Sequence, residues 1–175
     1  VGMPIIASRW LSGAAKQEDA GIMIGMIIFQ PGQARQVYCK QHLHADEYPY
    51  FVQGDNQVYL SSGKDKLGLS ICYELSVPEH SANLHKNGAT VYISSVAKTA
   101  EGMKKAAEIL PPMARDYSMT VLLSNCVGQC DNFDSCGKSA VWDDRGLLLD
   151  QLDDVSEGIL LFDTAAGKPV KKLIC

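Results

Sequence analysis

The stretch KLGLSICYELSVPE, residues 66–79, is the part of the chain around which the rest can be arranged. Its apolar residues alternate with small ones over residues 67–71, which predicts a buried strand. Residues 77–80 predict the start of a helix with proline in its first turn. Cys72 therefore lies at the corner between a strand and a helix. A side chain there stands clear of the sheet, beside backbone N–H groups that open the helix, which is a typical position for a nucleophile.

The composition indicates one domain over residues 1–175 with a small-molecule partner. The chain is 46% hydrophobic, enough for a sizeable core, and carries a net charge of −4. Nucleic acids and anionic membranes need a basic surface, so we expect neither as a partner. The longest apolar run, residues 21–29, is too short to cross a bilayer, and the N-terminus has no signal-peptide pattern. We expect a soluble, cytoplasmic protein.

The chain has six cysteines, which could form three disulfides. However, a normal apolar fraction is not typical of a small secreted domain held together by disulfides. We therefore interpret them as free thiols: Cys39, Cys72, Cys126, Cys130, Cys136 and Cys175.

Strands and helices are expected to alternate, with hairpins near the C-terminus. The helices are expected after Cys72, to residue 86, and at 100–117, where Pro111-Pro112 should kink or split the helix. Two loops stand out: residues 41–54, and a polar, cysteine-bearing loop at 126–137. The pattern indicates an α/β fold with mixed sheets. The strands are expected at residues 3–7, 21–30, 36–39, 58–60, 67–71, 90–94, 120–124, 139–142, 147–149 and 158–162.

Three residues form a candidate catalytic constellation: Cys72, Lys40 at the end of an earlier strand, and Glu47 in the loop between them. Cysteine attacks as a thiolate, so it needs a base or a cation to lower a pKa of about 8.5. A lysine does this and can also hold an oxyanion. Each residue alone has an ordinary interpretation, as a core thiol, a solvated surface charge and a loop carboxylate.

Together, KQHLHADEYPYFVQG (residues 40–54) and GLSICYELSVPE (68–79) resemble the carbon–nitrogen hydrolase, or nitrilase, superfamily. In that family a lysine precedes a His-Leu pair, a glutamate follows before an aromatic residue and a glycine, and the nucleophilic cysteine lies in a strand–Cys–Tyr–acid–Pro-Glu elbow. Later signatures match too, and the resemblance covers essentially the whole chain. The matching positions in these two stretches are Lys40, His42, Leu43, Glu47, Phe51, Gly54, Cys72, Tyr73, Pro78 and Glu79.

The resemblance implies an αββα sandwich and a Glu–Lys–Cys triad that needs no cofactor or metal. Cys72 would attack a carbonyl or nitrile carbon, and Lys40 with the Tyr73 backbone N–H would hold the oxyanion. Glu47 would orient Lys40 and keep it charged. Glu74, where aspartate is commoner, and Asn125 would belong to the oxyanion or supporting shell. The substrate would be an amide, carbamoyl compound or nitrile, and we favour an amidase over a nitrilase. We also expect the protein to form a homodimer.

The general-base glutamate of the family is not found before Lys40, because Glu18 lies in a polar stretch with no apolar strand leading to it. We therefore expect these residues to be the C-terminal two-thirds of a longer enzyme, incomplete at the N-terminus. A non-catalytic member of the fold that acts as a binding or assembly module remains an alternative.

Two alternatives to this chemistry are a metal site and a cysteine–histidine enzyme. The spacing of Cys126, Cys130 and Cys136 lacks the paired form of most zinc sites, and His42 with His44 could offer two rings to a metal. A cysteine–histidine enzyme would need His80 or His85, but no sequence feature aims either ring at Cys72.

Overall fold

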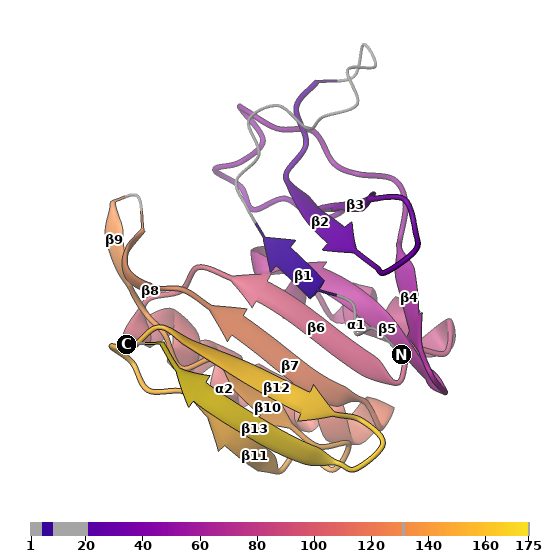
Figure 1. The fold of residues 1–175 in the computed structure, drawn as a ribbon. Helices are drawn as coiled ribbons and strands as arrows, with labels where there is room; N and C mark the ends of the chain where they lie inside the picture. The colour runs from indigo at the N-terminus through magenta and orange to yellow at the C-terminus, as the bar shows by residue number, and fades with distance from the viewer. Residues whose placement is uncertain (1–4, 9–20, 131, 175) are drawn as a thin grey trace.

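The computed structural model describes residues 5–8, 21–130 and 132–174, and its elements are labelled in Figure 1. Within this part of the chain, thirteen strands, two α-helices and one short 3-10 helix form a mixed α/β fold, as the sequence predicted. No helix of the described residues is long and apolar enough to cross a membrane.

The largest sheet has six strands in the order β11-β10-β7-β6-β5-β4. The central strands β5, β6 and β7 are parallel, and antiparallel partners flank them on both sides. The turn predicted at residues 144–146 is confirmed, since the Gly146 N–H donates to the Asp143 carbonyl between β10 and β11. All six strands were predicted, each with one or both ends shifted, and β4, β6, β10 and β11 begin one residue later than expected. The strands are β4 (Tyr59–Ser62), β5 (Asp65–Ile71), β6 (Val91–Val96), β7 (Thr120–Asn125), β10 (Ala140–Trp142) and β11 (Leu148–Gln151).

Helices α1 (Pro78–Lys86) and α2 (Ala100–Tyr117) cover one face of this sheet (Figure 1). Helix α1 packs closely on β5, because a Cβ added to Gly68 would lie 2.8 Å from the Leu84 side chain. Helix α2 continues through Pro111 and Pro112, so of the two predicted outcomes, a kink or a split, the split does not occur. Burial of its apolar face against the sheet offsets the backbone hydrogen bonds that the two prolines remove.

A three-stranded sheet, in the order β1-β2-β3, packs on the opposite face. Strands β1 (Ile5–Ser8), β2 (Gly25–Phe29) and β3 (Gln36–Cys39) are antiparallel, and β2 and β3 form the predicted hairpin. Met26 and Ile28 are buried against the large sheet. The prediction that residues 21–30 are buried on both faces is wrong, because Phe29 lies on the outer face, 42% exposed, with Arg35 over its ring.

Two further hairpins complete the described residues. The predicted loop at 126–137 instead contains β8 (Val127–Cys130) paired with β9 (Phe133–Cys136). Strand β12 (Gly158–Asp163) was predicted, but its partner β13 (Lys168–Leu173) was not. The described residues thus form three layers of the expected αββα sandwich: one layer of helices and two sheets.

Candidate active site

Cys72 lies at the sharp corner that the sequence predicted. Strand β5 ends at Ile71, and a 3-10 helix (Cys72–Ser76) turns the chain before α1 begins at Pro78. The sequence had not indicated this intervening turn. Cys72 has a φ of 49°, in the left-handed region that a residue with a Cβ rarely adopts. Such backbone strain is characteristic of functional sites, and here it fixes the thiol at the end of a buried strand.

Lys40 directly follows β3 and is 1% exposed, so it is not a solvated surface charge. Its Nζ donates to both carboxylate oxygens of Glu47 at 2.6 Å. The backbone of Lys40 is also paired, because its N–H donates to the Ile24 carbonyl and its own carbonyl accepts from the Gly54 N–H, each at 2.8 Å. The ammonium group is therefore held by a fixed backbone and a fixed counter-charge.

The loop between β3 and β4 holds Glu47 in place. The His44 N–H donates to Glu47 Oε2 at 2.7 Å, and the Glu47 carbonyl accepts from the Phe51 N–H at 2.9 Å. Gly54 allows the loop to return to Lys40, since a Cβ there would lie 2.6 Å from the Cys39 Cβ. These contacts explain why a long loop of polar residues can keep one carboxylate beside a buried lysine.

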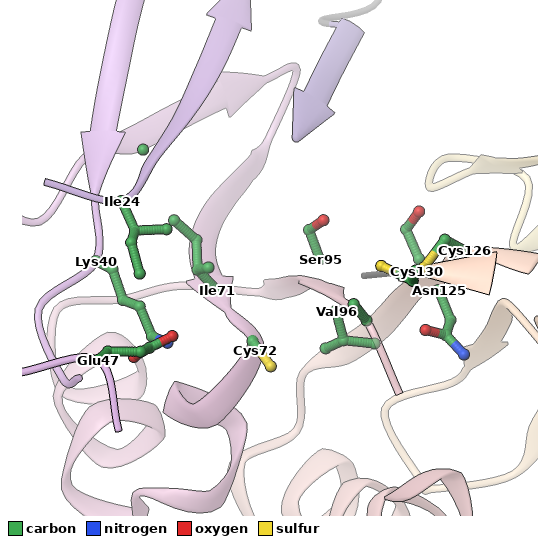
Figure 2. Close-up of a pocket in the computed structure, with 13 residues that line it drawn as sticks. Ile24, Lys40, Glu47, Ile71, Cys72, Ser95, Val96, Asn125, Cys126 and Cys130 are labelled. Carbon is green, nitrogen blue, oxygen red and sulfur yellow. The ribbon is translucent and has the colours of Figure 1, made fainter. Parts of the chain in front are cut away.

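Lys40, Glu47 and Cys72 line one pocket of about 280 Å³ (Figure 2). Figure 2 shows Lys40 and Glu47 on one side with Cys72 beside them, and Asn125, Cys126 and Cys130 on the other. The Lys40–Glu47 pair supplies the only charged residues among the described lining residues. The remaining wall is formed by Ile24, Gly25, Ile71, Ser95, Val96, Ala97 and Ser124.

Glu74 is completely buried beneath this site. Its carboxylate accepts hydrogen bonds from the backbone N–H groups of Gln41 (2.6 Å), His42 (3.2 Å) and Ile71 (2.7 Å). The Tyr38 hydroxyl lies 2.9 and 2.8 Å from its two oxygens. Burial raises the pKa of Glu74, and the hydrogen bonds from the backbone and Tyr38 oppose that rise.

Tyr73 and Asn125 lie in different surroundings. Tyr73 is 37% exposed, and its ring meets His44 edge to face at 5.1 Å. Asn125 is buried at the end of β7, and its amide makes hydrogen bonds to the Lys98 backbone, the Gly137 carbonyl and the Ser135 hydroxyl. This amide joins β7 to the backbone at Lys98 and to the end of β9. The expected oxyanion role of Tyr73 rests on its backbone N–H and stays a prediction.

The competing sites gain no support from the described residues. None of their groups of histidine, cysteine, aspartate and glutamate could hold a metal, and none of the five described cysteines forms a disulfide. His44 instead contacts Asp46 at 2.6 Å, and His85 stacks on Tyr117. Glu18 and Cys175 lie outside the described residues.

Sequence reasoning missed Tyr38 and the part that His80 plays. The His80 Nε2 lies 3.1 Å from the Tyr38 hydroxyl, and burial lowers the pKa of His80 to about 4. His80 is therefore neutral near pH 7, and its 3.8 Å approach to Glu74 is not an ion pair there. One signal was present: Tyr38 and Lys40 are two residues apart at the end of a strand, and so project from the same face.

This chain is similar to known proteins in family, sequence and fold. A family model of carbon-nitrogen hydrolases matches residues 2–167. Probable nitrilase C965.09 of Schizosaccharomyces pombe is 29% identical over 164 residues, which cover 90% of this chain and 59% of that protein.

Two solved structures share the fold. A carbon-nitrogen hydrolase from Helicobacter pylori G27 has a TM-score of 0.75 at 22% identity, covering 88% of this chain and 59% of that one. An amidase from Nesterenkonia sp. has a TM-score of 0.69 at 24% identity, covering 75% and 51%. The chain thus spans between half and three-fifths of these relatives. Because the family model covers nearly all of its residues and the fold agrees, this chain belongs to the carbon-nitrogen hydrolase family.

Proposed function

We propose that this protein is a thiol hydrolase that cleaves a non-peptide carbon–nitrogen bond in a small neutral amide. The observation that carries the proposal is the strained corner that places Cys72 in one pocket with buried Lys40 and its ion-pair partner Glu47. A thiol at the end of a rigid strand beside a fixed ammonium is suited to nucleophilic catalysis.

In the proposed reaction, the Cys72 sulfur forms a bond to the amide carbonyl carbon. The oxygen becomes an oxyanion that accepts hydrogen bonds from Lys40 and from the Tyr73 backbone N–H. Two of the three N–H bonds of the Lys40 ammonium are directed to Glu47, so one remains for this oxygen. The carbon–nitrogen bond then breaks, and the nitrogen takes a proton and leaves as ammonia or an amine. Water hydrolyses the thioester to the acid and regenerates the thiol.

The family resemblance assigns the proton transfers to a further glutamate. No carboxylate other than Glu47 lines the pocket among the described residues, and Glu47 is already paired with Lys40. General acid–base transfer of this kind is typically worth about 10² to 10⁴ in rate. Glu47 is therefore proposed to keep Lys40 charged and oriented rather than to act as the base.

Two observations favour an amide among the possible substrates. A variant of the Nesterenkonia sp. AN1 amidase has been solved in complex with butyramide, and other variants carry acrylamide or fluoroacetamide adducts at the active-site cysteine. In this chain, the lining residues beyond the Lys40–Glu47 pair are uncharged, which suits a neutral acyl group better than a carboxylate-bearing one.

Ammonia release by the intact protein, including any residues that precede this chain, from butyramide, butyronitrile and N-carbamoyl-alanine tests the proposal, with Cys72→Ala as the inactive control. We expect release from butyramide that is absent in Cys72→Ala. Faster release from the nitrile or the carbamoyl compound would reassign the substrate class. No release from any compound would favour the non-catalytic binding module.

A homodimer is also proposed, as the family resemblance implies. Light scattering of the protein at several concentrations measures this directly. A monomeric mass at all concentrations would contradict it.

A further inference from the structure

Glu74 connects the two backbone segments that carry the proposed catalytic residues. Its Oε1 accepts from the N–H of Gln41, the residue directly after Lys40. Its Oε2 accepts from the N–H of Ile71, the residue directly before Cys72. One buried carboxylate therefore bridges β3 and β5 at the points where their chains enter the pocket.

The orientation of this carboxylate is set by Tyr38. The fully buried phenol lies within 2.9 Å of both Glu74 oxygens and donates its proton to them. Neutral His80 can then donate its Nε2 proton to the Tyr38 oxygen, from 3.1 Å. Since neither Tyr38 nor His80 lines the pocket, this chain of hydrogen bonds acts behind the site.

A carboxylate with these partners needs no cation. Three backbone N–H groups and one phenol supply four donors to two oxygens, and such charge-assisted hydrogen bonds are stronger than neutral ones. Glu47 differs, because its main partner is the ammonium of Lys40. The Glu47 carboxylate thus binds the side chain of Lys40, whereas the Glu74 carboxylate binds the backbone on either side of the site.

We propose that Glu74 is a positioning residue that fixes Lys40 relative to Cys72 by binding the backbone next to each, with Tyr38 orienting its carboxylate. The inference rests on the proposed function, because it assumes that the Lys40–Cys72 geometry governs the reactivity of the thiol. A misplacement of about 1 Å can cost a catalytic site as much as 10²-fold in rate.

Glu74→Gln tests the charge without changing the shape. The amide has the same length as the carboxylate, but its NH₂ group would face backbone N–H donors and repel them. Glu74→Asp tests the opposite change, since it keeps both oxygens on a shorter side chain. A residue that only fills space would tolerate glutamine better than aspartate, whereas a positioning carboxylate predicts the reverse.

Tyr38→Phe removes one donor and leaves the carboxylate in place. Its matched control is Tyr92→Phe, because Tyr92 is equally buried and no hydrogen bond joins its hydroxyl to Glu74 in the described residues. This pair also keeps the inference testable if Glu74→Gln does not fold.

The measurement is the rate of iodoacetamide alkylation at each cysteine, resolved by peptide mass spectrometry. Exposed Cys126 is the reference for ordinary reactivity. Half-buried Cys39, whose pKa is raised by burial, reports on the integrity of the fold, because general loosening would accelerate its alkylation.

We expect alkylation at Cys72 to fall about tenfold in Glu74→Gln and about threefold in Tyr38→Phe, with Cys39 unchanged and Glu74→Asp between the wild type and Glu74→Gln. Tyr92→Phe should match the wild type. A reactive Cys72 that is unaffected by Glu74→Gln and Tyr38→Phe would overturn the inference alone. If Cys72 of the unchanged protein reacts no faster than Cys126, the proposed function and the inference both fail.

Discussion

The two sides of the pocket present the same reactive residue type in different surroundings. On one side, Cys72 occupies a strained corner beside the ion pair of buried Lys40 with Glu47. On the other, Cys126 is exposed and Cys130 lies on the β8–β9 hairpin, on the same side of the pocket as Asn125 (Figure 2). In the proposed mechanism, Cys72 is the nucleophile because of its backbone position and the neighbouring charge, since all three thiols have access to the pocket.

The buried polar residues behind the two sides of the pocket differ as well. The Cys72 side rests on buried ionisable groups, namely Lys40, Glu74 and His80. The hairpin side rests on Asn125, a neutral amide with hydrogen bonds to backbone and hydroxyl groups. Substitutions on the first side should therefore affect the chemical step, and those on the second should affect binding and stability.

The largest effect is expected at Cys72. Cys72→Ala and Cys72→Ser should fold and lose all detectable amide hydrolysis, because neither side chain supplies a thiolate. Ammonia release measures activity, and thermal unfolding checks the fold. Retained turnover in either variant would remove Cys72 from the mechanism and end the contrast between the two sides.

Lys40→Ala should lower kcat by about 10² or more, as expected for the loss of an oxyanion-hole donor. It should also lower the free energy of unfolding, because Glu47, whose side chain is 14% exposed, loses its counter-charge. Glu47→Gln should shift kcat in the same direction but less steeply. A change confined to KM would make Lys40 a substrate-binding residue instead.

Acid should weaken the Cys72 side through His80. Its folded pKa of about 4 lies below its ordinary 6.5, so its contribution to stability is present above pH 6.5 and is lost as pH falls toward 4. The free energy of unfolding should fall by about 3 kcal/mol once the pH is below the folded pKa of His80 and both states are protonated. Four groups surround His80: Glu74, Tyr38, His42 and Tyr92. Burial raises the pKa of Glu74, so protonation of Glu74 favours the folded state as the pH falls and partly offsets the loss of stability from His80.

Urea unfolding of the wild type and His80→Phe at pH 7.5 and 4.5 measures this contribution. The difference in unfolding free energy between the two pH values should be smaller in the variant. His85→Gln is the control, since His85 is exposed and forms no ion pair within the described part of the chain, so the difference should stay unchanged. Equal pH sensitivity of His80→Phe and the wild type would contradict the assignment.

On the hairpin side, Asn125→Ala should cost about 2 kcal/mol of stability, because it leaves buried backbone groups at Lys98 and Gly137 without partners. We expect KM to rise more than kcat falls, since the pocket wall loosens while the Cys72 corner stays intact. Steady-state kinetics with butyramide measure kcat and KM separately. A fall in kcat as large as that of Lys40→Ala would place Asn125 in the oxyanion shell.

The smallest effect is expected from Cys126→Ser. The substitution keeps the size of an exposed side chain nearly unchanged, so activity and stability should stay within about twofold and 0.5 kcal/mol of the wild type. Activity lost as completely as in Cys72→Ala would show that both sides of the pocket take part in the chemistry.

Local patterns were sufficient to predict the strands that carry the site. The alternation at 67–71 with Pro78 beyond it located the Cys72 corner, and the hairpin ending at Cys39 located Lys40. The β8–β9 hairpin was missed because its residues are polar and show no apolar alternation. The sequence left open whether α2 is kinked or split, because local propensity does not compare the cost of two prolines with the burial of a whole helix face.

Contacts between distant segments could not be predicted from the sequence. The partners of Glu74 are mostly backbone N–H groups of residues 41, 42 and 71, and any residue except proline could supply them. Burial of Lys40 likewise depends on how the two sheets pack. Family resemblance placed Glu74 near the site, but only the folded arrangement shows which groups its carboxylate binds.

Trapping the acyl intermediate tests the central claim most directly. The protein is incubated with butyramide, quenched in acid during turnover, digested, and each cysteine peptide is examined by mass spectrometry. Our account predicts a butyryl thioester on the peptide that contains Cys72, with none on peptides containing Cys126 or Cys130. Turnover without an adduct on Cys72, or with the butyryl group on a hairpin cysteine, would contradict it.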